Sequence, residues 1–101
     1  MNILKTQEGS TLTIALEGRL DTTTSPQLEG ELRSSVNGIS ELIFDLGALD
    51  YISSAGLRVL MWLEVEMEKR GGEVQVTHAP ESVLKIFELA GFMDVVHVIT
   101  E

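Results

Sequence analysis

Segments with strand periodicity alternate with segments with helix periodicity along this chain. This alternation constrains the fold more than any other feature of the sequence. Thr11–Glu17 alternates between apolar and polar residues, which is typical of a strand with one buried face. The shorter Asn2–Gln7 segment ends just before Gly9 and can pair with it as a hairpin. After Gly18 interrupts this alternation, segments with helical spacing alternate with short apolar runs.

The central part of the chain predicts two helices around a strand. The first helix begins at Pro26 after a group of capping residues and ends at Asn37. Leu42–Phe44 is a continuous apolar run, as in a strand covered on both faces, and turn residues follow it over Gly47–Asp50. The second helix starts near two adjacent serines, and it ends at about Arg70 before two glycines.

The last third repeats this pattern. Val74 and Val76 indicate a strand, a helix runs from Pro80 to Gly91, and Val95–Ile99 fits an edge strand. The predicted order is therefore β-β-α-β-α-β-α-β. It implies an α/β fold in which an opening hairpin leads into a mixed sheet with helices packed on it. A chain of 101 residues with no linker-like stretch is expected to form one domain over residues 1–101.

Charge and composition exclude several partners. Seven Lys and Arg against sixteen Asp and Glu give a net charge of −9, which repels nucleic acid and anionic membranes. No apolar run reaches the roughly 18 residues of a membrane span, and the N-terminus does not resemble a signal peptide. The chain has no cysteine. We therefore expect a cytoplasmic protein. We also expect it to be a monomer or a weak dimer.

The motifs of catalysis are missing from the sequence. No glycine-rich phosphate loop is present, and the two histidines, His78 and His97, do not have metal-ligand spacing. We expect His78 in a loop between a strand and a helix, and His97 at an edge or surface position. The nucleophile elbow needs a glycine two residues before its serine, but Ile52 stands there before Ser54. The sequence predicts a protein that is not an enzyme and has no metal or cofactor.

The adjacent serines Ser53 and Ser54, followed by Gly56, allow two interpretations. A serine hydroxyl at a helix start can accept a hydrogen bond from a free N–H of the first turn, and such a cap contributes about 1 kcal/mol. An exposed hydroxyl in the same place is also a natural phosphoacceptor, because a phosphate there faces the positive end of the helix dipole. The residues alone favour the cap.

Several separate motifs resemble those of one family in the right order. They are Gly18-Arg19-Leu20-Asp21, Asp45-Leu46, the run from Leu49 to Leu60 that contains Ser53-Ser54-Ala55-Gly56-Leu57, Gly71-Gly72-Glu73-Val74, and the late Pro80, Val83, Phe87 and Ala90-Gly91-Phe92 pattern. Together they resemble a STAS domain, in particular a stand-alone bacterial anti-sigma factor antagonist, and the resemblance covers essentially the whole chain.

The resemblance implies a protein that switches partners. Such antagonists bind, when unphosphorylated, an anti-sigma factor that is also a serine kinase with a GHKL-type ATP site, and a sigma factor is thereby released. The kinase phosphorylates a serine two residues before the motif glycine, and a PP2C-like phosphatase removes the phosphate. Counting back from Gly56 gives Ser54. Ser53 stands where the family often has aspartate, so both serines remain candidates at this stage.

The resemblance also implies a surface for the partner around this serine. Asp21 matches an aspartate of the family's loop near the phosphoacceptor, and it can equally be a turn or cap residue. A helical wheel places Val59, Leu60, Leu63 and Met67 toward the sheet, whereas Met61, Trp62 and Val65 lie on the other side. Trp and Met are common in interface cores, but packing against a neighbouring helix explains them as well. The predicted partner-binding residues are Asp21, Thr22, Ser53, Ser54, Gly56, Leu57, Arg58, Met61 and Trp62.

A second function remains open. The chain can be a constitutive STAS subunit of a larger signalling or transport complex that does not titrate a sigma factor. A kinase of the GHKL type among the bound proteins separates the two functions, because only the switched antagonist needs one.

Overall fold

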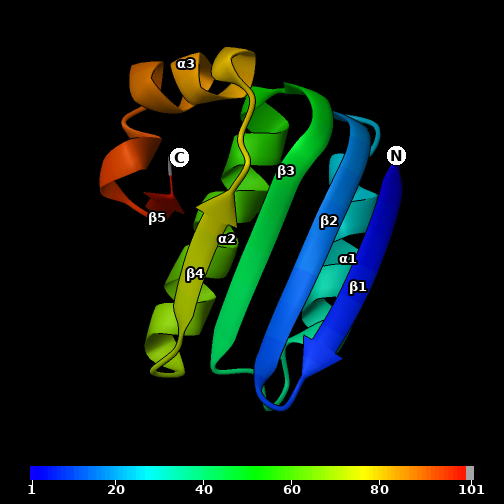
Figure 1. The fold of residues 1–101 in the computed structure, drawn as a ribbon, viewed down its shortest axis with the longest axis vertical. Helices are drawn as coiled ribbons and strands as arrows, with labels where there is room; N and C mark the ends of the chain where they lie inside the picture. The colour runs from blue at the N-terminus through cyan, green and yellow to red at the C-terminus, as the bar shows by residue number, and fades with distance from the viewer. Residues whose placement is uncertain (100–101) are drawn as a thin grey trace.

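The computed structural model describes residues 1–99, which form a five-stranded sheet and three α-helices (Figure 1). In chain order the elements are β1 (Asn2–Glu8), β2 (Thr11–Leu20), α1 (Ser25–Ser35), β3 (Glu41–Ile52), α2 (Ser54–Lys69), β4 (Glu73–Thr77), α3 (Glu81–Leu89), a short 3-10 turn η1 (Phe92–Asp94) and β5 (His97–Ile99). This order confirms the predicted β-β-α-β-α-β-α-β chain and the α/β class.

The strands lie in the sheet in the order in which they occur in the chain. β1 and β2 pair as an antiparallel hairpin, whereas β2, β3, β4 and β5 are parallel to one another. The mixed sheet predicted from the sequence is thus confirmed. Because β2 and β3 are parallel neighbours, their carboxyl ends meet at the same edge of the sheet, where Leu20 pairs with Ile52. The loops that open α1 and α2 therefore start side by side.

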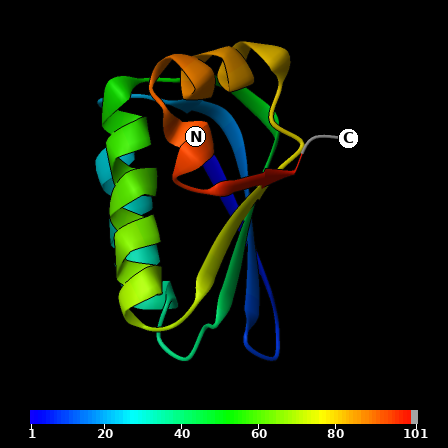
Figure 2. The same cartoon turned by 90° about the vertical axis from the view of Figure 1, so that its left-hand side faces the viewer.

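Only one face of the sheet is covered by α1 and α2, while α3 lies across one end (Figure 2). Successive crossovers between parallel strands are right-handed, so a chain that moves steadily in one direction across a sheet places its helices on the same face. Leu42 and Phe44 accordingly point into the core, and Ile43 lies on the open face, half-buried. The expectation that Leu42–Phe44 is covered on both faces was wrong.

Two strands run further than the sequence predicts. Gly18 does not end β2 but adopts a positive φ of 105° within it, beside a shift in register, and the strand continues to Leu20. β3 likewise continues through Gly47–Asp50, which we expected to form a turn. These extensions carry β2 and β3 to the starts of α1 and α2, where the candidate site lies.

The start of α2 packs directly on the sheet through Gly56. A Cβ atom on Gly56 would stand 2.7 Å from Cγ of Leu20 and 3.0 Å from Cγ1 of Ile52, which leaves no room for a side chain. Further along the helix, Val59, Leu60, Leu63 and Met67 are buried, as the helical wheel predicts. In α3, Val83 and Phe87 are buried, whereas Ala90 is exposed.

Candidate functional site

Ser53 caps α2 and has its polar groups engaged. Its side-chain oxygen accepts a hydrogen bond from the backbone N–H of Gly56 at 3.3 Å, and its own N–H donates to the carbonyl of Leu20 at 2.9 Å. Its carbonyl accepts the N–H of Leu57 at 2.9 Å, which closes the first turn of the helix. Ser53 therefore fits the capping interpretation.

Ser54 is the first residue of α2 and differs from its neighbour. Its side chain is exposed, and no hydrogen bond joins its hydroxyl to any residue within 1–99. A group attached at this oxygen would lie at the positive end of a helix of 16 residues, where the dipole favours an anion. The structure thus separates the two serines into a cap and an accessible hydroxyl.

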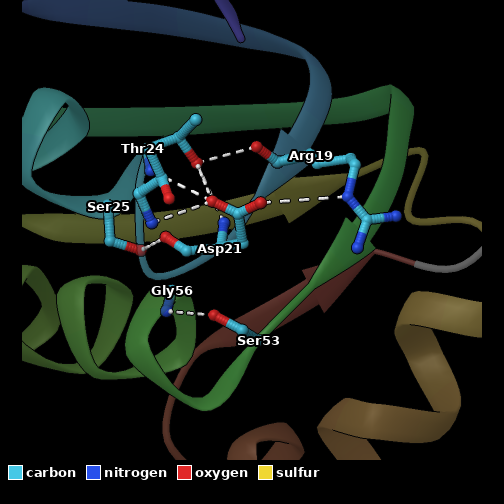
Figure 3. Close-up of polar contacts among 7 residues, drawn as sticks. Arg19, Asp21, Thr24, Ser25, Ser53 and Gly56 are labelled. Atoms are coloured by element: carbon cyan, nitrogen blue, oxygen red, sulfur yellow. Dashed lines mark hydrogen bonds and ion pairs between the residues drawn. The ribbon is translucent and has the colours of Figure 1, made fainter.

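Asp21 organises the turn that leads from β2 into α1 (Figure 3). One oxygen of its carboxylate accepts hydrogen bonds from the N–H groups of Thr23 and Thr24 at 3.0 and 3.1 Å and from the Thr24 hydroxyl. Its other oxygen lies 3.8 Å from Nε of Arg19. The backbone N–H of Thr24, helped by Thr23, the Thr24 hydroxyl and Arg19, holds the pKa of this carboxyl below its ordinary value, against a smaller opposing effect of desolvation. Asp21 therefore has a structural role here, as a turn residue.

The Asp21 turn and the Ser53 cap lie beside each other although 32 positions separate them in the sequence. The Leu20 carbonyl, next to Asp21, accepts the N–H of Ser53 and so ties the two loops together. Figure 3 shows both clusters at the same edge of the sheet, one from the β2–α1 loop and one from the start of α2. Thr22, at the tip of the Asp21 turn, is exposed. The parallel pairing of β2 and β3 thus assembles one composite surface.

An exposed stripe continues from Ser54 along α2. Arg58, Met61 and Val65 follow Ser54 at helical spacing, and the side chains of Met61 and Val65 are 41% and 51% exposed. Trp62 behaves differently because it is half-buried against α1, with the guanidinium of Arg33 lying 4.4 Å from its ring centroid. The outer apolar side chains predicted from the wheel are therefore divided between solvent and a contact between helices.

A shallow groove of about 360 Å³ separates α1 from α2 next to this stripe. Its lining combines apolar surface with one acidic and one basic side chain: Thr22, Ser25, Pro26, Glu29, Ala55, Arg58, Val59 and Trp62. Glu29 in this lining pairs with Arg33, whose Nε lies 3.4 Å from the carboxylate. The groove therefore lies beside the first turns of α2, and three of the predicted partner-binding residues, Thr22, Arg58 and Trp62, line it.

The predicted partner-binding residues fall into three groups. Thr22, Ser54, Arg58 and Met61 are exposed, and Asp21, Ser53 and Trp62 are half-buried. Gly56 and Leu57 are buried, so their place is in the core that positions α2. The sequence did not point to Pro26, Glu29 and Arg33 from α1, because nothing in a single sequence indicates which residues of one helix face another helix.

Metal-ligand groups and membrane-spanning helices were sought among the residues that the structure describes. Residues 1–99 contain no group of three or more His, Asp or Glu side chains that could hold a metal ion. Within the same range, no helix is long and apolar enough to cross a membrane. His78 lies in the loop between β4 and α3, and His97 is exposed in the edge strand β5, as expected.

Comparison with known proteins assigns the chain to a family. The model of the STAS domain matches residues 2–101. A protein of Bordetella bronchiseptica, BtrV, which is assigned as an anti-sigma factor antagonist, is 36% identical over 85 residues, which are 83% of this chain and 73% of BtrV. The chain therefore belongs to the STAS domain family, and an anti-sigma factor antagonist is among its relatives in sequence.

Solved structures agree on the fold. An anti-sigma factor antagonist from Mycobacterium paratuberculosis superposes with a TM-score of 0.88 at 21% identity, covering 99% of this chain and 86% of that one. The unphosphorylated form of the antagonist SpoIIAA gives a TM-score of 0.86 at 19% identity, over 99% of this chain and 90% of that chain. The phosphorylated form of SpoIIAA, from Bacillus, gives 0.77 at 18% identity, over 99% and 93%. At such identities the likeness concerns the fold.

Proposed function

We propose that this protein is an anti-sigma factor antagonist whose binding is switched by phosphorylation of Ser54. In its unphosphorylated form it binds an anti-sigma factor in the cytoplasm, so that a sigma factor is released and transcription is regulated indirectly. The partner is a serine kinase of the GHKL type, and a PP2C-like phosphatase reverses the modification. The protein itself is a binding module and catalyses no step.

The observation that carries this proposal is that the two adjacent serines have different environments. Ser53 already accepts a hydrogen bond from the N–H of Gly56, whereas the hydroxyl of Ser54 is exposed at the first residue of α2. Ser54 is also continuous with the exposed side chains of Arg58 and Met61. A phosphate on Ser54 would therefore be placed on the surface that a partner covers.

For phosphoryl transfer, this chain supplies a nucleophilic oxygen, and the kinase supplies the bound ATP and the base. The Ser54 oxygen forms a bond to the γ-phosphorus of ATP, the bond to the ADP oxygen breaks, and the hydroxyl proton passes to a base of the kinase. The product carries about −1.5 to −2 charges at neutral pH. Because this charge faces the helix N-terminus, the fold tolerates it, but a partner surface would have to desolvate it.

Phosphorylation by the cognate GHKL-type serine kinase tests the proposal. With ATP and that kinase, mass spectrometry should find one phosphate, on Ser54. Ser54→Ala should abolish the modification, and Ser53→Ala should only slow it, since the helix start loses its cap but keeps the acceptor. A phosphate mapped to Ser53 or Thr22 contradicts the assignment, and a protein that binds its partner without ever being phosphorylated is a constitutive STAS subunit.

A further inference from the structure

Arg58 is exceptional among the basic residues of this acidic chain. Six of the seven Lys and Arg side chains form an ion pair with a carboxylate: Lys5 with Glu31, Arg19 with Asp21, Arg33 with Glu29, Lys69 and Arg70 with Glu66, and Lys85 with Glu81. Arg58 has no ion pair with any residue of the described range 1–99, and its side chain is exposed. In a chain of net charge −9, it is the one Lys or Arg side chain within that range whose charge is left for another group.

The position of Arg58 points to that group. Arg58 lies four residues after Ser54 in α2, and side chains at this spacing are neighbours with Cβ atoms about 5–6 Å apart. The other guanidinium at this edge of the sheet belongs to Arg19, which is already held by Asp21 and lies 4.4 Å from the ring centroid of Tyr51. A phosphate on Ser54 therefore has one free guanidinium within reach.

We propose that Arg58 works as a two-way charge contact: it binds a carboxylate of the partner when Ser54 is unmodified, and it pairs with the phosphate when Ser54 is phosphorylated. This inference rests on the proposed function of Ser54. It adds a residue that recognises the partner and explains how the modification removes a favourable contact in addition to introducing a charge.

A carboxylate is the partner group that fits the surroundings of Arg58. Arg58 borders the groove between α1 and α2, whose other charged lining residue, Glu29, is paired with Arg33. The rest of the lining near Arg58 is apolar, with Val59, Ala55 and Trp62. An acidic side chain next to an apolar one on the partner would match both features. Since most of this chain repels acids, the contact would fix the register of the complex as well as its affinity.

The phosphate on Ser54 should bind Arg58 more strongly than the partner's carboxylate does. It is held on the same helix, so pairing costs no loss of translational freedom, and a guanidinium can donate two parallel hydrogen bonds to phosphate oxygens. A phosphate carries more charge than a carboxylate and offers more acceptor oxygens. Once the phosphate is paired with Arg58, the partner's carboxylate faces a negative phosphate in the place where it had contacted a cation.

The pairing within the helix can be tested without any partner or kinase. Phosphoserine is incorporated at position 54 during translation, and the second pKa of the phosphate is followed by ³¹P NMR titration. Arg58→Gln should raise this pKa by about half a unit, because a nearby cation favours the dianion. Arg58→Lys should largely preserve the lower value. The helix dipole acts equally on all variants and cancels in the comparison.

Arg19→Gln is the matched control, since it removes another exposed guanidinium from the same edge of the sheet. It should leave the pKa of the phosphate unchanged. Equal shifts in Arg19→Gln and Arg58→Gln would mean that the phosphate senses only the general field, and this result would overturn the inference. No shift in Arg58→Gln would overturn it as well.

The second arm titrates the GHKL-type kinase, purified, with four proteins: the parent and the Arg58→Gln variant, each in its unmodified and its phosphorylated form. Arg58→Gln should weaken binding of the unmodified protein roughly tenfold, and phosphorylation should then have a smaller effect than in the parent. Lys69→Gln, about three turns further along α2, loses the same charge and should bind normally. A larger effect of phosphorylation in the Arg58→Gln protein would contradict the two-way contact.

The outcomes distinguish this inference from the proposed function. If the kinase phosphorylates Ser54 but the ³¹P titration does not depend on Arg58, the proposed function stands and the role of Arg58 fails. If Arg58 lowers the pKa of the phosphate but no kinase modifies Ser54, the proposed function fails while the pairing remains a property of the helix. Thermal melts of each variant establish that the domain is folded in every comparison.

Discussion

The two sides of α2 both carry large apolar side chains, but these side chains have different environments. On the inner side, Leu60, Leu63 and Met67 are at most 1% exposed and pack on the sheet. On the outer side, Met61 and Val65 are 41% and 51% exposed, in line with Ser54 and Arg58. The same chemical types therefore serve stability on one side and remain available for contact on the other. Burial, and not residue type, separates the two roles.

Truncation of the inner side should have the largest effect on stability. Leu63→Ala removes a fully buried side chain and leaves a cavity, so we expect a loss of about 2–5 kcal/mol in the free energy of unfolding. Urea denaturation of the two proteins measures it. A loss below about 1 kcal/mol would mean that α2 is loosely packed, and the contrast between its two sides would disappear.

Phosphorylation of Ser54 should have the reverse profile, with a large effect on binding and little on stability. The dipole at the helix start favours the anion by about 0.3–1 kcal/mol, so the melting temperature should stay the same or rise slightly. A partner surface must desolvate the phosphate, which costs several kcal/mol, so affinity should fall a hundredfold or more. Ser54→Asp should reproduce part of this effect. A melt lowered by many degrees would indicate a switch that works by unfolding.

Substitutions on the outer side sharpen the comparison. Met61→Glu should leave the fold intact and weaken partner binding by about tenfold, because a charge replaces apolar contact surface. Trp62→Ala should weaken binding and also cost about 1 kcal/mol of stability or more, since its ring packs against Arg33 of α1. Circular dichroism and partner titration separate the two effects. Extensive unfolding of Met61→Glu would show that this side chain belongs to the core.

Glu64, between the two sides, should give the smallest effect. Burial raises the pKa of its carboxyl, with Glu68 and Glu73 adding repulsion, and one of its oxygens is buried without a hydrogen-bond partner among residues 1–99. The folded state thus holds the proton more tightly than the unfolded state, and stability is lost as the pH rises through the raised pKa. Glu64→Gln should be slightly more stable than the parent at pH 7, and the difference should vanish at about pH 3, where both states are protonated. A variant that is less stable at pH 7 would show that the carboxylate has a favourable contact.

The fold was largely predictable because each of its elements carries a local pattern. Thr11–Glu17 has the period of a strand, and the inner residues of α2 have the period of a helix. The errors arose where local and tertiary preferences differ. Gly18 and Gly47 resemble chain breaks in the sequence, but both lie within strands of the sheet, where pairing between β2 and β3 continues past them.

The candidate site was predicted in part. The adjacent serines indicated a helix start, and the STAS motifs pointed to Ser54 as the phosphoacceptor, but the sequence could not assign the cap to one serine. That assignment depends on one hydrogen bond, from the N–H of Gly56 to Ser53. Asp21 was correctly placed in a loop, and its hydrogen bonds to Thr23 and Thr24 show its part as a turn residue.

The sequence by itself determined the order of the elements, the acidic charge and the two-sided character of α2, because these depend on neighbours along the chain. Only the tertiary structure decided which face of the sheet is covered, that the Asp21 turn lies beside Ser53, and that Trp62 meets Arg33. It also decided which arginine has no ion pair within residues 1–99, since the pairs of Lys5 with Glu31 and of Trp62 with Arg33 depend on strand and helix packing. Those contacts join residues far apart in the chain, and a local pattern carries no information about them.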